Sequence, residues 1–102
     1  MAAYLMAEID VHDITGYEDY RRRVSATLPA FGGRFLVRGG NTETLEGDWR
    51  PQRLVIIEFP NMERARAWWS SPEYGAARAI RQRTAHARMI VAAGVEEAER
   101  PT

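Results

Sequence analysis

Hydrophobic and polar residues alternate along four short stretches of the chain, and a period of two predicts β-strands. These strands are expected at residues 3–11, 34–39, 53–59 and 87–93. Pro60 and Gly94 follow two of them, and both residue types commonly end strands. The alternation therefore predicts a sheet of four strands.

The segment between the first two strands has apolar residues every three or four positions, which is typical of an amphipathic helix. Thr15 and Glu18 have the spacing of a capping box and predict where this helix begins. Its apolar face is expected to comprise Tyr17, Tyr20, Val24, Leu28 and Phe31. The pair Gly32 and Gly33 predicts the end of the helix.

A second helical region is predicted between the last two strands, in two pieces. Asn61 is expected to cap the first piece, which runs through Trp69. Ser71 followed by Pro72 is expected to cap the second piece, which runs to about Thr84. The helical crossover is therefore interrupted near Ser70.

The predicted order β-α-β-β-α-β is that of an α+β ferredoxin-like sandwich, with both helices on one face of a four-stranded antiparallel sheet. A chain of 102 residues has room for a single core, so residues 1–95 are interpreted as one domain. Residues 96–102 are expected to form a flexible acidic C-terminal tail.

Side chains of a strand alternate between the two faces of its sheet, so the parity of residue numbers sorts them. The odd-numbered positions are the more apolar and are expected to pack on the helices. They are Leu5, Ala7, Ile9, Val11, Phe35, Val37, Val55, Ile57, Phe59, Met89 and Val91. This set is the predicted core of the subunit.

The even-numbered positions carry six apolar residues, too many for a sheet face in contact with water. They are Tyr4, Met6, Leu36, Leu54, Ile56 and Ile90. We call this surface the even face. The same face of a second subunit would cover it, so the sequence predicts a homodimer in which two sheets form an α+β barrel.

The even face is also expected to carry six charged residues, namely Glu8, Asp10, Arg34, Arg38, Glu58 and Arg88. If Leu36 lies opposite Ile56, Arg34 faces Glu58 and Arg38 stays available for a ligand. An arginine fork suits a carboxylate, enolate or phosphate, and a partly desolvated carboxyl of Glu58, Glu8 or Asp10 could have the raised pKa of a general base. The alternative interpretation is a set of structural ion pairs that fixes the dimer register.

The connection at residues 39–51 is longer than a hairpin requires, and long loops are often functional. Glu46 and Asp48 offer carboxylates there, and Trp49 offers a ring. The connection is predicted to close a pocket against the even face. In the alternative, Trp49 packs on the neighbouring subunit.

Several other side chains have a structural interpretation as well as a functional one. The rings of Trp68, Trp69 and Tyr74 are more typical of a core than of a ligand platform, although the Tyr74 hydroxyl could donate to an anion. Capping alone explains Ser71. His12 and His86 are interpreted as strand-end residues, with no partner at metal-ligand or triad spacing.

Composition excludes several classes of function. The 14 basic and 14 acidic residues balance, so neither nucleic acid nor a membrane is an expected partner. All the basic residues are arginine, which excludes a Schiff-base lysine and a P-loop, and the chain has no cysteine. No metal or cofactor is expected. Without signal-peptide features or an apolar run of roughly 20 residues, a cytoplasmic location is expected.

Four segments together resemble the domain-of-unknown-function family numbered 1330: FGGRFLVRGG at 31–40, LEGDW at 45–49, VIIEFP at 55–60 and AWWSSPEY at 67–74. The resemblance implies a dimeric α+β barrel, in a superfamily that includes antibiotic-biosynthesis monooxygenases, muconolactone isomerases and haem-degrading enzymes. It implies no particular activity. The motif positions of the family fall on Arg34, Arg38, Glu46, Trp49, Glu58, Trp68, Ser71 and Tyr74. Trp69 departs from a pattern where tyrosine is common, and the helix cores lack the histidine that haem-degrading relatives use.

Two functional hypotheses remain. The first is a cofactor-independent enzyme for a small anionic metabolite, in which Arg38 orients the anion, Glu58 or Glu8 moves a proton, and Trp49 or Tyr74 closes the pocket. The second is a non-catalytic homodimeric module that binds a ligand or a protein.

Overall fold

The computed structural model describes residues 1–95, and the predicted tail at 96–102 lies outside them. The main elements follow the predicted order. They are β1 (Ala3–Val11), α1 (Ile14–Thr27), β2 (Arg34–Arg38), β3 (Leu54–Phe59), α2 (Met62–Trp69), α3 (Pro72–Thr84) and β4 (Ala85–Ala93).

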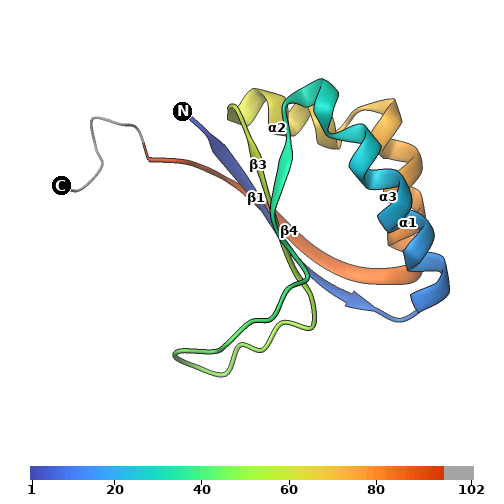
Figure 1. The fold of residues 1–102 in the computed structure, drawn as a ribbon, viewed down its shortest axis with the longest axis vertical. Coiled ribbons are helices and arrows are strands. Elements are labelled where there is room, and N and C mark those ends of the chain that lie inside the picture. Colours follow the sequence, from blue (N-terminus) through green and yellow to red (C-terminus); the bar gives the residue numbers. More distant parts are fainter. Residues whose placement is uncertain (96–102) are drawn as a thin grey trace.

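The four strands form one antiparallel sheet in the order β2-β3-β1-β4. All three helices lie on one side of this sheet, and the segment between β2 and β3 extends away from both layers (Figure 1). The predicted ferredoxin-like α+β fold is confirmed. No helix within residues 1–95 combines the length and the apolar character needed to cross a membrane.

Helix α1 begins two residues earlier than the sequence pattern indicated. The side chain of Asp13 is the N-cap, and its Oδ1 accepts a hydrogen bond from the amide of Gly16 at 3.0 Å. The predicted capping box of Thr15 with Glu18 is therefore wrong, because Asp13 is an equally good cap and comes first. Thr15 lies inside the helix.

The end of α1 also differs from the prediction. The helix stops at Thr27, and Pro29–Phe31 forms a separate 3-10 turn, because proline has no amide hydrogen to continue the α-helical ladder. Gly32 then takes a φ of 73°, a left-handed conformation that glycine adopts without steric cost. This tight turn leads the chain directly into β2.

The two predicted caps of the crossover are confirmed. Asn61 Oδ1 accepts from the amide of Arg64 at 2.8 Å, and Ser71 Oγ accepts from the amide of Tyr74 at 3.2 Å. These bonds satisfy amide groups that the first turn of a helix leaves without partners. The capped helices α2 and α3 fix the aromatic residues of the helical layer.

The core lies between the sheet and the helices, as parity predicted. Six of the predicted odd-position residues are fully buried: Leu5, Ala7, Ile9, Val55, Ile57 and Phe59. Four more are partly buried against this core: Val11, Phe35, Met89 and Val91. The exception in the predicted set is Val37, which does not belong to the core cluster.

A β-bulge in β2 explains the exception. The Cα partners of β2 and β3 are Arg34–Glu58, Phe35–Ile57, Val37–Ile56 and Arg38–Val55. Leu36 is the extra residue, so the predicted pairing of Leu36 with Ile56 is wrong. A one-residue shift moves every later side chain to the other face of the sheet. Arg38 therefore shares a face with Val55, on the helix side, and the prediction that it lies on the even face is wrong.

The even face has no helix over it within residues 1–95 (Figure 1). Leu36 is 47% exposed and Ile90 is 64% exposed, while Met6, Leu54 and Ile56 are half-buried. The sheet thus has one face buried by helices and one face with large apolar side chains in contact with water.

Candidate functional site

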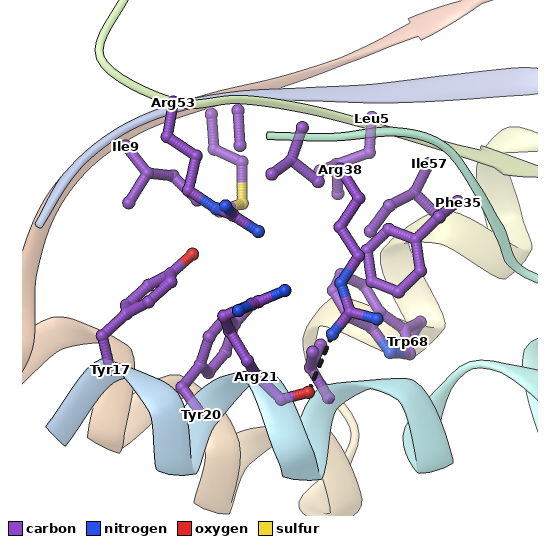
Figure 2. Close-up of a pocket in the computed structure, with 14 residues that line it drawn as sticks. Leu5, Ile9, Tyr17, Tyr20, Arg21, Phe35, Arg38, Arg53, Ile57 and Trp68 are labelled. Carbon is purple, nitrogen blue, oxygen red and sulfur yellow. Dashed lines mark hydrogen bonds between the residues drawn. The ribbon is translucent and has the colours of Figure 1, made fainter. Parts of the chain in front are cut away.

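A cavity lies between the sheet and helix α1, on the side opposite the even face. The enclosed volume is about 20 Å³, and it rises to about 360 Å³ when the open space at the mouth is counted. Most of its wall is apolar, and the polar side chains on it are three arginines and two tyrosines in addition to the indole of Trp68. These are Arg21, Arg38, Arg53, Tyr17 and Tyr20. Figure 2 shows the three guanidinium groups and the Tyr17 hydroxyl directed into one shared space.

Arg38 reaches this cavity because of the bulge in β2. Its Nη2 donates to the backbone carbonyl of Arg21 at 2.8 Å, and its guanidinium carbon lies 4.3 Å from the centre of the Phe35 ring. Burial lowers the pKa of Arg38, and the positive charges of Arg21 and Arg53 lower it further. An anion beside Arg38 would oppose both effects.

Arg53 enters the cavity from the residue that precedes β3. Its guanidinium lies 5.6 Å from the ring centre of Tyr17 and directly over the backbone of Gly39. Gly39 has a φ of 72°, and a Cβ added there would overlap the Arg53 guanidinium. The buried Nε of Arg53 has no hydrogen-bond partner within residues 1–95. A buried donor without an acceptor is energetically costly.

Arg21 lies on α1, one helical turn after Tyr17. Its Nη1 forms an ion pair with Glu18 Oε1 at 3.1 Å, where both side chains are about half exposed. The Nε of Arg21 is buried and, in the described part of the chain, also lacks a hydrogen-bond partner. The Arg21 side chain therefore contacts both the protein surface and the cavity wall.

Two tyrosines of α1 add hydroxyl groups to the site. Burial raises the pKa of Tyr17, and burial with the neighbouring Tyr74 hydroxyl raises that of Tyr20. Both phenols are therefore neutral at pH 7. Tyr17 can donate a hydrogen bond to an anion, as its direction in Figure 2 allows.

A buried network lies behind Tyr20. The Tyr20 and Tyr74 hydroxyls are 3.1 Å apart, and Arg81 Nε donates to the Tyr74 hydroxyl at 3.2 Å. Tyr74 is fully buried and Arg81 is 5% exposed. Tyr74 thus lies behind Tyr20 and does not line the cavity. Its hydroxyl is therefore not placed to donate directly to an anion there.

The cavity is electrostatically one-sided. Three guanidinium groups contribute to it, whereas its wall includes no aspartate, glutamate or histidine from residues 1–95. Apolar surroundings weaken solvent screening, so these charges act strongly on a small molecule placed among them. The arrangement can bind an anion and stabilise negative charge that develops on it.

The predicted acids of the even face form ion pairs. Glu58 accepts from Arg34 Nε at 2.7 Å, across the predicted strand pair. Glu8 accepts from Arg88 through both Nε and Nη2, and from Trp49 Nε1 at 2.7 Å. These bonds hold the pKa of Glu8 below its usual value, so the raised pKa expected for Glu8 is wrong.

The remaining predicted residues are spread over the molecule. Trp49 lies against the even face through its bond to Glu8 and borders a shallow pocket there with Leu54 and Ile90. Glu46 is exposed on the β2–β3 connection, and Asp10 is exposed at the end of β1. Only the part of the connection around Trp49 therefore approaches the even face, and the connection does not contribute to the cavity that holds Arg38.

Trp68 and Ser71 have structural partners. Trp68 is buried, stacks 3.9 Å from Tyr74 between ring centres, and donates from Nε1 to Thr27 Oγ1 at 2.9 Å. It also forms one wall of the cavity. Ser71 Oγ donates to the carbonyl of Trp68 at 2.7 Å in addition to its capping bond.

The two histidines are neighbours in space, although far apart in sequence. The ring centres of His12 and His86 are 5.2 Å apart at the ends of β1 and β4. Their positions agree with the interpretation as strand-end residues, and the sheet brings the two rings next to each other. No group of three or more histidine or acidic side chains suited to a metal was found within residues 1–95.

Sequence reasoning missed Arg21, Arg53 and Arg81. Each has a signal in the sequence. Arg53 shares odd parity with Val55 and Ile57, and Arg21 follows Tyr17 by the four positions that put two residues on one helix face. Arg81 follows Tyr74 by seven positions. Charged residues at positions where the strand or helix pattern places the core were thus the signal for these site residues.

This fold and cavity define a class: a small ferredoxin-like α+β domain with a cationic cavity between its sheet and its helices. Residues 2–95 match the family described as Domain of unknown function (DUF1330), and the chain belongs to that family. The predicted family resemblance is confirmed. No curated protein matches the chain.

Several solved structures share the fold. A protein of unknown function from Rhodopseudomonas palustris is 18% identical with a TM-score of 0.74, covering 93% of this chain and 83% of its own. SnoaB, a cofactor-independent oxygenase from Streptomyces nogalater, is 11% identical with a TM-score of 0.63, covering 93% and 94%. A dimeric ferredoxin-like protein from Bacteroides fragilis is 13% identical with a TM-score of 0.62, covering 91% and 96%.

Proposed function

We propose that the protein binds a small anionic metabolite, a carboxylate or an enolate, at the open mouth of the cavity between the sheet and α1, with Arg38 as the main anion-binding residue. One observation carries the proposal. The Arg38 guanidinium lies in an apolar cavity with two further guanidinium groups and no carboxylate from residues 1–95. Buried charges normally have partners, so such a cavity favours an anionic ligand.

The groups around Arg38 suit a ligand with oxygen atoms. A guanidinium donates in a planar fork that matches a carboxylate, and charge-assisted bonds of this kind are about twice as strong as neutral ones. Tyr17 supplies a neutral hydroxyl directed at the same space (Figure 2). The apolar walls from Phe35, Ile57 and Trp68 would contact the carbon skeleton.

The enzymatic form of the proposal is a cofactor-independent reaction of an enolate. Guanidinium groups stabilise an enolate over its enol, which lowers the pKa of the bound enol, and its proton passes to solvent. SnoaB, of the same fold, is a cofactor-independent oxygenase, which supports chemistry of this kind. Glu58 and Glu8 take no part in this form, because the sheet separates them from Arg38.

The second candidate is a non-catalytic module that binds the same anion. It is favoured by the make-up of the wall, where no carboxylate or imidazole from the described residues could act as a general base. In this form the cavity retains the ligand unchanged. Turnover of an identified ligand distinguishes the two candidates.

We propose further that the protein is a homodimer joined through its even faces. The exposed side chains of Leu36 and Ile90 are the kind that an isologous contact covers. The Arg34–Glu58 and Arg88–Glu8 pairs lie on the same surface and would fix the register of the two sheets. The fold of a dimeric Bacteroides fragilis protein supports this assembly.

A thermal-shift screen of small carboxylates, enolisable keto acids and matched neutral amides tests the binding proposal. A specific ligand stabilises the folded state by about 2.7 kcal/mol at 100 times its Kd. Arg38→Gln should abolish the shift, and Arg34→Gln, on the even face, should retain it. Equal shifts in the two variants would remove Arg38 from the site, and no shift with any anion would refute the proposal.

A further inference from the structure

We infer that the ligand of this cavity carries two negative charges, on groups separated by a short carbon skeleton, and that Arg53 binds the second one. This inference rests on the proposed function, which requires only one anionic group on Arg38. It names the substrate class as short dicarboxylates and the enolates of short keto acids.

The charges around the cavity show why one negative charge is too few. Arg21, Arg38 and Arg53 supply three positive charges, and Glu18 supplies one negative charge through its ion pair with Arg21. The difference, three minus one, is two. Arg38 and Arg53 have no ion pair with any carboxylate of residues 1–95. A monoanion would leave one of these two partly buried cations without a counter-charge.

The two cations lie at different places along α1. Arg38 is bonded to the carbonyl of Arg21, and Arg53 lies against the ring of Tyr17. Tyr17 and Arg21 are four residues apart on the same helix face, an axial separation of about 6 Å. Two anionic groups on one short skeleton would therefore reach one cation each, whereas a single carboxylate would reach one.

Arg53 is held in place by its surroundings. Gly39 has no side chain and has a left-handed backbone, which leaves room for the Arg53 guanidinium beside the residue that follows Arg38. Its Nε is one of two buried side-chain donors without a partner in residues 1–95, the other being Arg21 Nε. Both atoms belong to residues that line the cavity. The donors without hydrogen-bond partners and the positive charges without counter-charges therefore lie in the same place.

Isothermal titration calorimetry with matched ligands tests the inference on the intact protein. Dicarboxylates from malonate to adipate are compared with their monomethyl esters, which keep the skeleton and lose one charge. At least one dicarboxylate should bind about tenfold or more tightly than its ester, since a charge-assisted contact contributes at least that factor. Arg53→Gln should reduce this ratio to near one, and Arg50→Gln, exposed on the preceding connection, should keep it.

The outcomes separate the inference from the proposed function. Esters that bind as tightly as the diacids, with binding still lost in Arg38→Gln, would overturn the second charge and keep the anion site. Binding of neither series, with no anion active in the thermal-shift screen, would overturn both. A ratio that survives Arg53→Gln would overturn the role of Arg53. Arg53→Lys keeps the positive charge and should retain part of the diacid-to-ester affinity ratio. This result would show that Arg53→Gln lowers the ratio by removing a charge and not by disturbing the fold.

Discussion

Arg38 Nη2 donates a hydrogen bond to the backbone carbonyl of Arg21 at 2.8 Å, and this bond joins β2 to α1 across the cavity. It exists because the bulge at Leu36 turns Arg38 toward the helices. The remaining guanidinium donors of Arg38 are left to face the cavity. A local irregularity of one strand thus decides on which side of the sheet the anion site lies.

Gly39→Ala should lower the free energy of unfolding by about 1–2 kcal/mol, because an L-residue is strained at a positive φ. The new methyl group would also displace the Arg53 guanidinium. Urea unfolding at fixed protein concentration measures the effect. Gly40→Ala is the matched control, since no atom lies within 4 Å of a Cβ added there. Equal stability of the two variants would contradict the fit of Gly39 against Arg53.

Ile90→Asp should convert the proposed dimer to a monomer, because it places a charge in the apolar even face. Ile90 is 64% exposed in the single subunit, so the change does not disturb the core. Sedimentation velocity at micromolar concentration gives the mass. Ile14→Asp introduces the same change at a residue 74% exposed on α1 and should remain dimeric. A monomeric parent protein would refute the even-face dimer.

Glu8→Gln should weaken the acid dependence of stability. Bonds from Arg88 and Trp49 lower the folded-state pKa of Glu8 below its ordinary value of 4.5. The stabilisation is therefore fully present above pH 4.5 and is lost as the pH falls through the lowered value. Urea melts should show wild type more stable than Glu8→Gln at pH 7, with the gap closing at pH 3. Glu46→Gln, exposed on the connection, is the control, and a gap that does not change with pH would contradict the account.

Tyr74→Phe should destabilise the protein by about 1–3 kcal/mol, because it leaves buried Arg81 Nε without its acceptor and Tyr20 without its partner. Chemical denaturation measures the loss. Tyr4→Phe, on the half-buried even face, makes the same atomic change without breaking such a network and should have a smaller effect. Equal losses would show that the Arg81 bond adds nothing.

The fold could be predicted from the sequence because periodicity acts over whole elements. The strand pattern, the caps at Asn61 and Ser71, and the Arg34–Glu58 pair are all confirmed. Asp13 and Thr15 are both good caps two residues apart, so local chemistry alone could not choose between them.

The site was harder to predict because it depends on one extra residue. Parity assumes a regular strand, and a single bulge reverses the face of every later position. Leu36 and Val37 are both ordinary strand residues, and no glycine marks the irregularity. Arg38 was therefore predicted on the wrong face of the sheet. Arg21 and Arg53 were not among the predicted site residues, although their positions matched the core pattern.

The most direct test of the central claim is an NMR titration that follows the arginine Nε–Hε signals with the tightest anion from the screen, assigned through single variants. The account predicts that the signals of Arg38, Arg53 and Arg21 shift together, while those of Arg34 and Arg88 stay in place. Shifts of Arg34 and Arg88 with no change at Arg38 would place the ligand on the even face and contradict the account.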